Sequence, residues 1–330
     1  MKYVVSGYIG FDNFGDEAIA RVLSQRLKDE GAEKITMISA NPNNTKMLHD
    51  VDACGRFNFI KSIDESDILI FGGGSVLQDV TSLRSLVYYL CVICTALFFG
   101  KKVQLLAQGI GPIKSRIGKF LTKKVLRNVE KISVRDFQSQ MLLKSWGIDA
   151  ELVNDPVFGM NITPKHQTGT VGIQIRECPQ IYENKDFLEN LAKELSKKFK
   201  EKNFEIISLQ DSYDSDICWK FGTMLKQNGA DNVMVCESLT LDDVIDRISG
   251  LEYLVAMRFH ANVVGIKSEV KTIAIDYDPK VRKIAEEYQL PLIKLDGTNL
   301  KEVFEAIEIV SESPETPSES SENQPNQNQA

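Results

Sequence analysis

The stretch YLVAMRFHANVVGI, residues 253–266, contains the pattern from which the architecture of this chain follows. Its apolar run Tyr253–Ala256 is typical of a buried parallel strand, and Ala261–Ile266 continues with helical spacing. Arg258 and His260 stand between these two segments, where the strand ends. Because open α/β sheets bind ligands at the carboxyl ends of their strands, we expect both side chains to face a site.

These two side chains suit different tasks in such a site. The guanidinium group of Arg258 can bind a carboxylate or a phosphate, and the imidazole of His260 can transfer protons near neutral pH. The same residues could instead form a structural ion pair and a hydrogen bond to backbone. The stretch by itself leaves the functional and the structural interpretation equally open.

Apolar strands alternate with helical patterns through the first half of the chain, which is typical of a mostly parallel sheet. The expected strands cover residues 2–6, 34–38, 67–71, 103–107, 131–134 and 151–153. The expected helices cover residues 16–29, 80–99, 117–129 and 136–146. A polar segment rich in breakers at residues 161–169 then predicts a domain boundary.

The same alternation restarts in the second half. Strands are expected at residues 170–175, 204–208, 232–235, 253–256 and 271–275, and helices at 185–200, 215–228, 241–249, 260–266, 279–288 and 300–310. We therefore expect an α/β protein with two Rossmann-like, doubly wound domains, residues 1–160 and 161–310, that face each other across a cleft. This arrangement resembles the glycosyltransferase-B (GT-B) fold. Residues 311–330 contain no large aliphatic or aromatic side chain, which predicts a disordered acidic tail.

Charge and cysteine content exclude several classes of protein. The formal net charge is -7, which argues against a nucleic-acid partner because such partners require a basic surface. We find no pattern of a signal peptide at the first residues, and the six cysteines are scattered, which favours buried structural thiols in a reducing cytoplasm. Cys91 and Cys94 have C-x-x-C spacing without further ligands nearby, so no metal site is expected.

Two segments were tested for contact with a membrane. The apolar run 86–99 is shorter than the ~20 residues that span a bilayer, which favours a core helix. The segment Lys114–Lys131 differs because its lysines and arginines alternate with apolar residues, as in helices that lie on anionic membranes. A solvated face on a globular helix is the alternative interpretation.

Three glycine-rich turns follow strands of the first half, and each predicts close approach of the backbone to a ligand or to a neighbouring helix. The first, residues 7–17, lacks both the Walker lysine and the G-x-G-x-x-G spacing of nucleotide sites. Its Asn13 and Asp16 are candidates for binding substrate hydroxyl groups, with helix capping as the alternative. The other two turns, residues 71–79 and 107–112, add the candidate cleft residues Gly73, Gly74, Ser75, Gln78 and Gln108.

Two further cations follow strands. Arg135 comes directly after the strand expected at 131–134, where a solvated arginine beside a capping Asp136 is the alternative. Lys280 follows Pro279 at the expected start of a helix, a position that disfavours a lysine unless an anion binds there. His49 and His166 fall in polar segments and are expected to be bystanders.

Six of these segments, taken in order, resemble the polysaccharide pyruvyl transferase family. They are residues 10–17, 72–79, 108–112, 133–136, 154–156 and 257–261, and the resemblance extends over residues 1 to about 310. Two positions depart from the family's pattern: Asp12 stands where glycine is expected, and Phe259 replaces leucine.

The resemblance implies transfer of pyruvate from phosphoenolpyruvate to a sugar diol of a cell-surface polysaccharide precursor, such as an N-acetylhexosamine, with release of phosphate. Arg135, Arg258 and Lys280 would then bind phosphoenolpyruvate, and His260 would transfer protons. Phosphoenolpyruvate is a co-substrate in this reaction, and no cofactor or metal is expected. A lipid-linked acceptor would bring the protein to the inner face of the cell membrane, with the basic segment Lys114–Lys131 against it.

Two other classes of protein fit part of the pattern. A sugar-nucleotide glycosyltransferase of cell-envelope polysaccharide synthesis would use the same architecture and bind a nucleoside diphosphate at the glycine turns. A scaffold that docks on the membrane without catalysis would not need Arg258, His260 and Lys280 together. Because one fold serves many functions, the architecture does not separate these classes.

Overall fold

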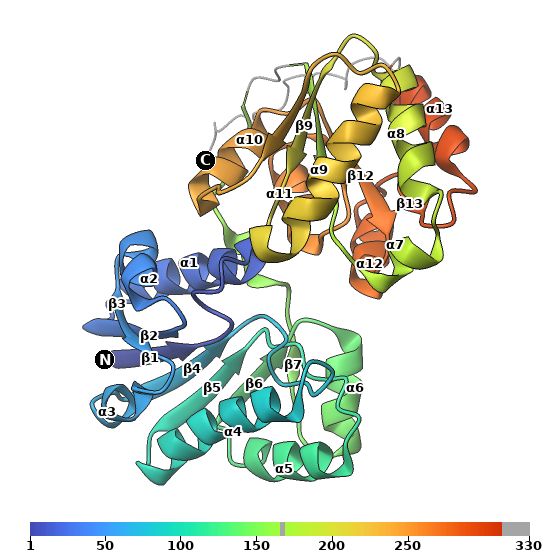
Figure 1. Cartoon of the computed structure of the whole chain (residues 1–330). Helices are drawn as coiled ribbons and strands as arrows, with labels where there is room; N and C mark the ends of the chain where they lie inside the picture. Colours follow the sequence, from blue (N-terminus) through green and yellow to red (C-terminus); the bar gives the residue numbers. More distant parts are fainter. Residues whose placement is uncertain (166–168, 312–330) are drawn as a thin grey trace, which may run out of the picture.

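The computed structural model describes residues 1–165 and 169–311 (Figure 1). Within them, the N-terminal sheet has seven strands in the order β3-β2-β1-β4-β5-β6-β7, all parallel. The strands are β1 (Lys2–Ser6), β2 (Lys34–Ser39), β3 (Asp52–Gly55), β4 (Ile68–Gly72), β5 (Lys102–Leu106), β6 (Lys131–Val134) and β7 (Glu151–Leu152).

The helices of the N-terminal domain begin at side chains that accept hydrogen bonds from the first turn. Asn13, Ser82, Ser115 and Asp136 cap α1, α4, α5 and α6 in this way. The helices are α1 (Phe14–Asp29), α2 (Pro42–His49), α3 (Phe59–Asp64), α4 (Leu83–Phe98), α5 (Arg116–Leu126) and α6 (Phe137–Ser145), followed by the 3-10 helix η1 (Pro156–Gly159).

The C-terminal sheet has the order β10-β9-β8-β11-β12-β13 and is also parallel. Its strands are β8 (Thr170–Gln174), β9 (Asn203–Ile207), β10 (Val233–Cys236), β11 (Tyr253–Ala256), β12 (Lys271–Asp276) and β13 (Leu292–Lys294). Its helices are α7 (Pro179–Glu183), α8 (Phe187–Lys198), α9 (Asp211–Gln227), α10 (Leu241–Ser249), α11 (Phe259–Lys267), α12 (Pro279–Glu287) and α13 (Leu300–Ser311).

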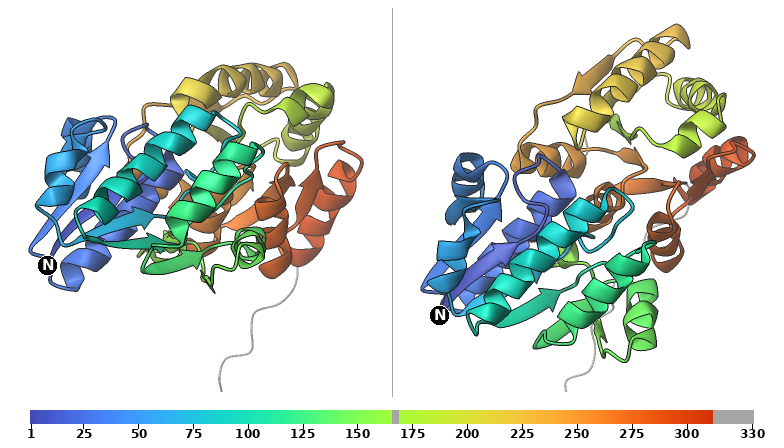
Figure 2. Two further views of the ribbon diagram at one scale, coloured as in Figure 1. Left: turned by 90° about the horizontal axis from the view of Figure 1, so that it is seen from below. Right: turned by 60° about the horizontal axis from the view of Figure 1, so that its bottom comes forward.

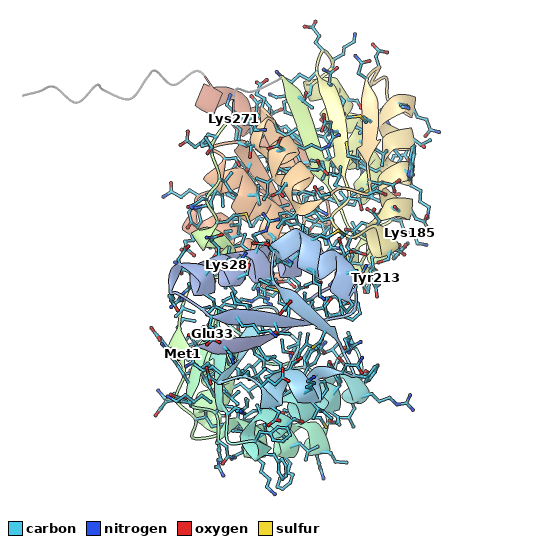
Figure 3. All side chains as sticks on the ribbon, turned by 90° about the vertical axis from the view of Figure 1, so that its left-hand side faces the viewer. Met1, Lys28, Glu33, Lys185, Tyr213 and Lys271 are labelled. Atoms are coloured by element: carbon cyan, nitrogen blue, oxygen red, sulfur yellow. The ribbon has the colours of Figure 1, made fainter. Side chains whose placement is uncertain are left out.

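One apolar core connects the two domains. Helix α1, which carries Lys28 near its end, lies between the two sheets (Figure 3). Its buried residues Ile19 and Leu23 belong to the same cluster as Leu241 and Val244 of α10. The backbone N–H of Phe14 also donates to the carbonyl of Leu209, at 3.1 Å. A large apolar interface of this kind limits relative motion of the domains.

The expectation of two parallel α/β domains in a GT-B-like arrangement is confirmed. The sequence analysis missed β3, β13 and the helices α2, α3 and α7, which are all short. His49 is therefore not in a loop: it lies buried in α2, and its Nε2 is 2.8 Å from Oε2 of Glu17. The prediction of buried thiols is wrong for Cys91 and Cys94, which are exposed on α4.

The predictions for the tail at 312–330 and for His166 concern residues outside the described part of the chain. Among the helices of the described residues, none has the length and apolar character needed to cross a membrane.

Candidate active site

The strand order of each sheet reverses beside its first strand, between β1 and β4 in one domain and between β8 and β11 in the other. Doubly wound sheets bind ligands at this point, outside the carboxyl ends of the strands. The loops after these four strands line one cavity of about 430 Å³ between the domains. Asn13 and Gly74 belong to its N-terminal wall, and Arg176 and Arg258 to its C-terminal wall.

Four cationic side chains line this cavity: Arg135, Arg176, Arg258 and Lys280. Arg135 directly follows β6, and Arg176 is the second residue after β8. Arg258 is the N-cap residue of α11, and Lys280 lies in the first turn of α12. All four come from the ends of strands or the starts of helices, so the two parallel sheets direct their charge to one place.

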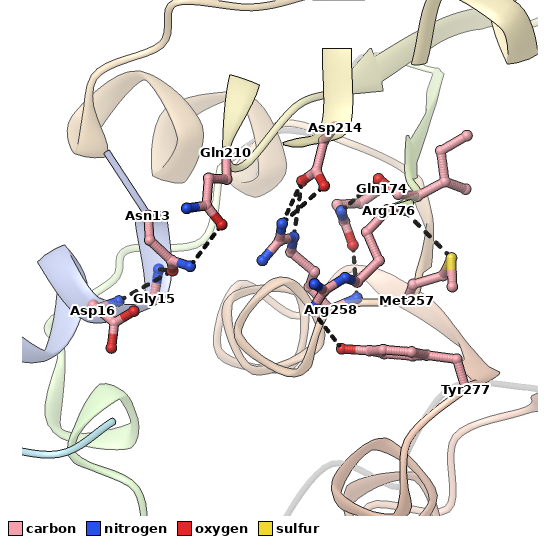
Figure 4. Close-up of polar contacts among 11 residues, drawn as sticks. Asn13, Gly15, Asp16, Gln174, Arg176, Gln210, Asp214, Met257, Arg258 and Tyr277 are labelled. Carbon is pink, nitrogen blue, oxygen red and sulfur yellow. Dashed lines mark hydrogen bonds and ion pairs between the residues drawn. The ribbon is translucent and has the colours of Figure 1, made fainter. Parts of the chain in front are cut away.

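A carboxylate fixes the orientation of Arg258. Its Nε and one Nη donate to the two oxygens of Asp214 at 2.9 and 2.8 Å (Figure 4). Asp214 is completely buried in α9, and the backbone N–H of Arg258 donates to Oε1 of Gln174 at 2.6 Å. Such a bidentate pair holds the plane of the guanidinium group at the cavity wall.

Asp155 joins Arg135 to His260. It forms an ion pair with Arg135, and its Oδ2 lies 3.7 Å from Nε2 of His260. Burial by itself would raise the pKa of Asp155, but the Arg135 guanidinium and His260 hold it well below its usual range. The ionised carboxylate therefore faces the imidazole ring.

The ring of His260 also packs against α1. A Cβ atom added to Gly15 would lie 2.0 Å from Nδ1 of His260, so only glycine leaves room for the ring there. Because Gly15 belongs to the N-terminal domain and His260 to α11, this contact sets the position of the imidazole across the cavity.

Ser75 links two of the cations. Its Oγ accepts from an Nη of Arg135 at 3.2 Å and from Nζ of Lys280 at 3.3 Å. Burial lowers the pKa of Lys280, and the neighbouring charge of Arg135 lowers it further. An anion bound between these groups would offset the repulsion between the two cations.

Arg176 is a cation that the sequence analysis did not select. One of its Nη atoms lies 3.4 Å from the hydroxyl of Tyr277, which also lines the cavity. Its Nε is buried without a hydrogen-bond partner among the described residues. A buried donor without a partner is costly, which is typical of a group that a ligand completes.

Asp16 is the carboxyl group on the opposite wall. It lies in the first turn of α1 and lines the cavity beside Gly74, where an added Cβ would be 2.8 Å from Oδ1 of Asp16. Burial raises the pKa of Asp16 to about 7, although Arg135 acts in the other direction. Near neutral pH this group can accept or release a proton.

The model of the family described as polysaccharide pyruvyl transferase matches residues 13–279. The chain belongs to this family. The matched range, residues 13–279, includes most of the residues that line the cavity, with Tyr8 and Lys280 just outside it. The search of curated proteins found no match.

Solved structures with similar folds are enzymes of other families. The UDP-GlcNAc 2-epimerase of Methanocaldococcus jannaschii aligns with a TM-score of 0.65 and 10% identity, over 95% of this chain and 93% of the other. The Neisseria meningitidis epimerase bound to UDP-GlcNAc has a TM-score of 0.61 and 12% identity, over 94% and 92%. A glycosyltransferase of Rickettsia africae has a TM-score of 0.60 and 15% identity, over 93% and 88%. At these identities the likeness concerns the fold alone.

Most of the candidate site residues from the sequence analysis line this cavity. They are His260, Arg135, Arg258, Lys280, Asn13, Asp16, Gly74, Ser75 and Gln78. Asn13 caps α1 and also donates to Oε1 of Gln210 at 3.0 Å, so capping and a position in the cleft are both realised. Gln78 orders the turn before α4 by accepting from the backbone N–H of Val80 at 2.6 Å.

Gly73 and Gln108 lie behind the cavity wall. An added Cβ on Gly73 would lie 2.6 Å from the Ile19 side chain, so this glycine allows close packing of α1. Gln108 is fully buried, and its side chain donates to the carbonyl of Gly109 at 3.3 Å. Neither residue is among those that line the cavity.

Asp12 occupies the position where the family pattern leads one to expect glycine. Its φ of 52° lies in the left-handed region, which glycine adopts most readily and aspartate tolerates. The departure from the pattern is therefore compatible with the same backbone turn.

Sequence reasoning also missed two carboxylates and one arginine. Arg176 follows β8 as Arg135 follows β6, so the same rule applied to every strand end would have found it. Asp155 could have been noted as part of the quoted segment 154–156. Asp214 gave no local signal, because only the tertiary structure brings α9 to Arg258.

Proposed function

We propose that the chain catalyses transfer of pyruvate from phosphoenolpyruvate to a diol of a saccharide acceptor, forming a cyclic ketal and releasing phosphate. Membership of the family supports a pyruvyl transfer to polysaccharide. The observation that carries the choice of donor is the convergence of Arg135, Arg176, Arg258 and Lys280 on one cavity. A small ligand with both a carboxylate and a phosphate matches this charge.

The proposed chemistry requires two proton transfers. His260 donates a proton to the methylene carbon of phosphoenolpyruvate while the first sugar oxygen bonds to the adjacent carbon. Asp16 accepts the proton of that hydroxyl group. The second hydroxyl oxygen then bonds to the same carbon, the bond to the phosphate oxygen breaks, and phosphate leaves with the proton from Asp16. The second hydroxyl proton returns to His260.

Each proposed role has support in the surroundings of the residue. The carboxylate of Asp155 lies 3.7 Å from Nε2 of His260, where it can orient the ring for proton transfer. Asp16 has a pKa of about 7, which suits a proton acceptor near neutral pH. Asn13, Ser75 and Gln78 supply polar groups for the acceptor. We propose no metal or cofactor, because cationic side chains can stabilise the charge of the donor.

A direct assay tests this proposal. The protein is incubated with phosphoenolpyruvate and a synthetic N-acetylhexosamine acceptor, while phosphate release and the mass of the acceptor are measured. We expect phosphate release only with the acceptor, a ketal on the product, and no loss of activity with a chelator. His260→Gln should lower kcat by at least ~100-fold, with an unchanged circular dichroism spectrum. Unchanged turnover in this variant would refute the role of His260.

A sugar-nucleotide glycosyltransferase remains the second candidate, favoured by the fold shared with the Rickettsia africae enzyme. Calorimetry with phosphoenolpyruvate and with UDP-sugars distinguishes the two candidates. Binding of phosphoenolpyruvate that weakens in Arg176→Ala supports pyruvyl transfer. Tight binding of a UDP-sugar without binding of phosphoenolpyruvate would replace it with glycosyl transfer.

A further inference from the structure

The charge of one segment opposes the charge of the whole chain. Residues 80–129 contain nine lysines and arginines and no aspartate or glutamate, whereas the formal net charge of the chain is -7. This segment includes α4 and α5, which pack side by side on one face of the N-terminal sheet (Figure 2). Most of these cations lie on α5 or directly beside it, so this part of an acidic protein is basic.

The cations on α5 and directly before it are free to meet an external partner. Lys114, Arg116, Lys119 and Lys124 are exposed, and none of them takes part in an ion pair among the described residues. In the sequence, Asp79 and Glu130 flank this region. Glu130 pairs with Lys102 at 3.3 Å, and Asp79 accepts from the backbone of Lys114 at 2.6 Å.

Large apolar side chains are exposed on the same two helices. Phe98 of α4 is 85% exposed, and Ile117 and Phe120 of α5 are 63% and 65% exposed. Ten of the eighteen exposed large apolar side chains of the described residues fall within residues 57–141. Exposed apolar side chains that gather on one part of a protein surface are typical of sites of interaction.

This surface begins at the rim of the proposed active site. Thr81 and Ser85 line the cavity, and the exposed residues Val80 and Leu83 stand beside them at the start of α4. The start of α5 packs beside this part of α4, because a Cβ added to Gly118 would lie 3.1 Å from the Leu86 side chain. The α4–α5 face is defined here by Phe98, Ile117, Phe120 and the exposed cations Lys114, Arg116, Lys119 and Lys124.

We infer that the α4–α5 face docks on an anionic lipid bilayer, with its apolar side chains inserted at headgroup level and its cations on acidic lipids. Lysines attract acidic lipids, and exposed aromatic and aliphatic side chains enter the boundary between headgroups and acyl chains. An acidic protein partner could pair with the cations, but it would leave the exposed phenylalanines without an apolar contact. The link to a lipid-borne acceptor rests on the proposed function, whereas the docking itself does not.

Sedimentation with lipid vesicles tests the docking without any substrate. We expect binding to vesicles of equal parts phosphatidylglycerol and phosphatidylcholine, weakening with salt, and little binding to phosphatidylcholine alone. Lys119→Glu/Lys124→Glu and Phe98→Ser/Phe120→Ser should each weaken binding at least ~10-fold. The matched controls Lys220→Glu/Lys226→Glu and Met234→Ser change exposed residues of the C-terminal domain and should bind like the unmodified chain.

The outcomes separate docking from catalysis. Absence of vesicle binding, or equal loss in the controls, overturns the proposal. A dimer that the α4–α5 variants dissociate, detected by ultracentrifugation, would assign the face to a second copy of the chain instead. If the proposed function also holds, these variants keep turnover on a soluble acceptor and lose it on an acceptor embedded in vesicles. Failure with both acceptors in the unmodified chain, despite vesicle binding, would refute the function and leave the docking intact.

Discussion

Asp16 lines the cavity and Asp155 contacts Arg135 and His260 of its wall, yet the surroundings of these two carboxyl groups shift their pKa values in opposite directions. Asp155 has Arg135 and His260 beside it, and these groups lower its pKa. Asp16 has no hydrogen-bond partner for its carboxyl oxygens among the contacts of the described residues, and burial raises its pKa to about 7. Two carboxyl groups with separated pKa values are typical of sites that move protons.

The Asp16 carboxyl group should make stability fall with rising pH. Its pKa is raised from 3.8 to about 7 in the folded chain, so the folded state binds the proton more tightly than the unfolded state. The free energy of unfolding should therefore decrease between pH 4 and pH 7 and level off above pH 7. The free energy of unfolding, measured by urea titration at several pH values, should decrease less in Asp16→Asn than in the unmodified chain. An equal pH dependence in both proteins would contradict the assignment.

The same variant should abolish most of the proposed activity. In the unmodified chain kcat should rise as pH passes through about 7, when Asp16 loses its proton. Asp16→Asn cannot accept a proton, so we expect a loss of ~100-fold or more and no rise near that pH. The pH profile of phosphate release measures both. Asp12→Asn, at the exposed neighbouring turn, is the control that should retain the profile.

Arg176 should contribute to donor binding. Its buried Nε has no partner among the described residues, and its guanidinium lines the cavity. Arg176→Ala should weaken phosphoenolpyruvate binding by ~10-fold or more, the size expected for a charged hydrogen bond. Calorimetry measures the dissociation constant. Arg282→Ala, an exposed arginine paired with Asp276, should leave it unchanged.

At the scale of elements, helix α1 serves both domains and also bounds the site. Its first turn presents Asp16 to the cavity, and Gly15 makes room for the ring of His260. Further along, Arg21 pairs with Asp242 of α10 at 3.1 Å. The start of one helix thus determines the positions of two groups to which we assign proton transfer.

Substitution of Gly15 tests this coupling. Alanine favours a helix over glycine by about 1 kcal/mol, but its Cβ would lie 2.0 Å from Nδ1 of His260. Gly15→Ala should therefore keep the fold and lower kcat by ~10-fold or more, as expected when a reacting group moves by about 1 Å. Gly222→Ala in α9 is the matched control, because its nearest neighbours are side chains at 3.1 and 3.3 Å outside the cavity. Full activity in Gly15→Ala would show that His260 can move without cost.

At the scale of the whole molecule, the core that includes α1 and α10 should make the two domains unfold together. The chain has two tryptophans, and each lies in a different domain: Trp146 follows α6, and Trp219 lies in α9. Trp146→Phe leaves only Trp219 as a fluorescence reporter, and Trp219→Phe leaves only Trp146. We expect both variants to unfold at the same urea concentration, after any change in overall stability is corrected for by circular dichroism. Separate midpoints would show independent domains.

A buried residue of this shared core should affect both reporters. Leu241 is 5% exposed in the cluster that also contains Ile19 and Leu23 of α1. Leu241→Ala should lower the free energy of unfolding by about 2–5 kcal/mol, as for other leucines truncated in cores. Fluorescence of Trp146 should report this loss although residue 241 belongs to the other domain. A change confined to Trp219 would contradict a shared core.

Local sequence patterns predict the parallel α/β class, the positions of the long helices and strands, and most of the side chains at the strand ends. These features depend on local periodicity and on the rule that parallel strands end at one edge. Which side chains meet depends instead on the packing of the folded chain. It brought Asp214 of α9 to Arg258, Gly15 of α1 to His260, and Glu17 to His49. The physical reason is that such contacts, and the pKa shifts that follow from them, depend on packing between elements distant in the chain, which no local pattern encodes.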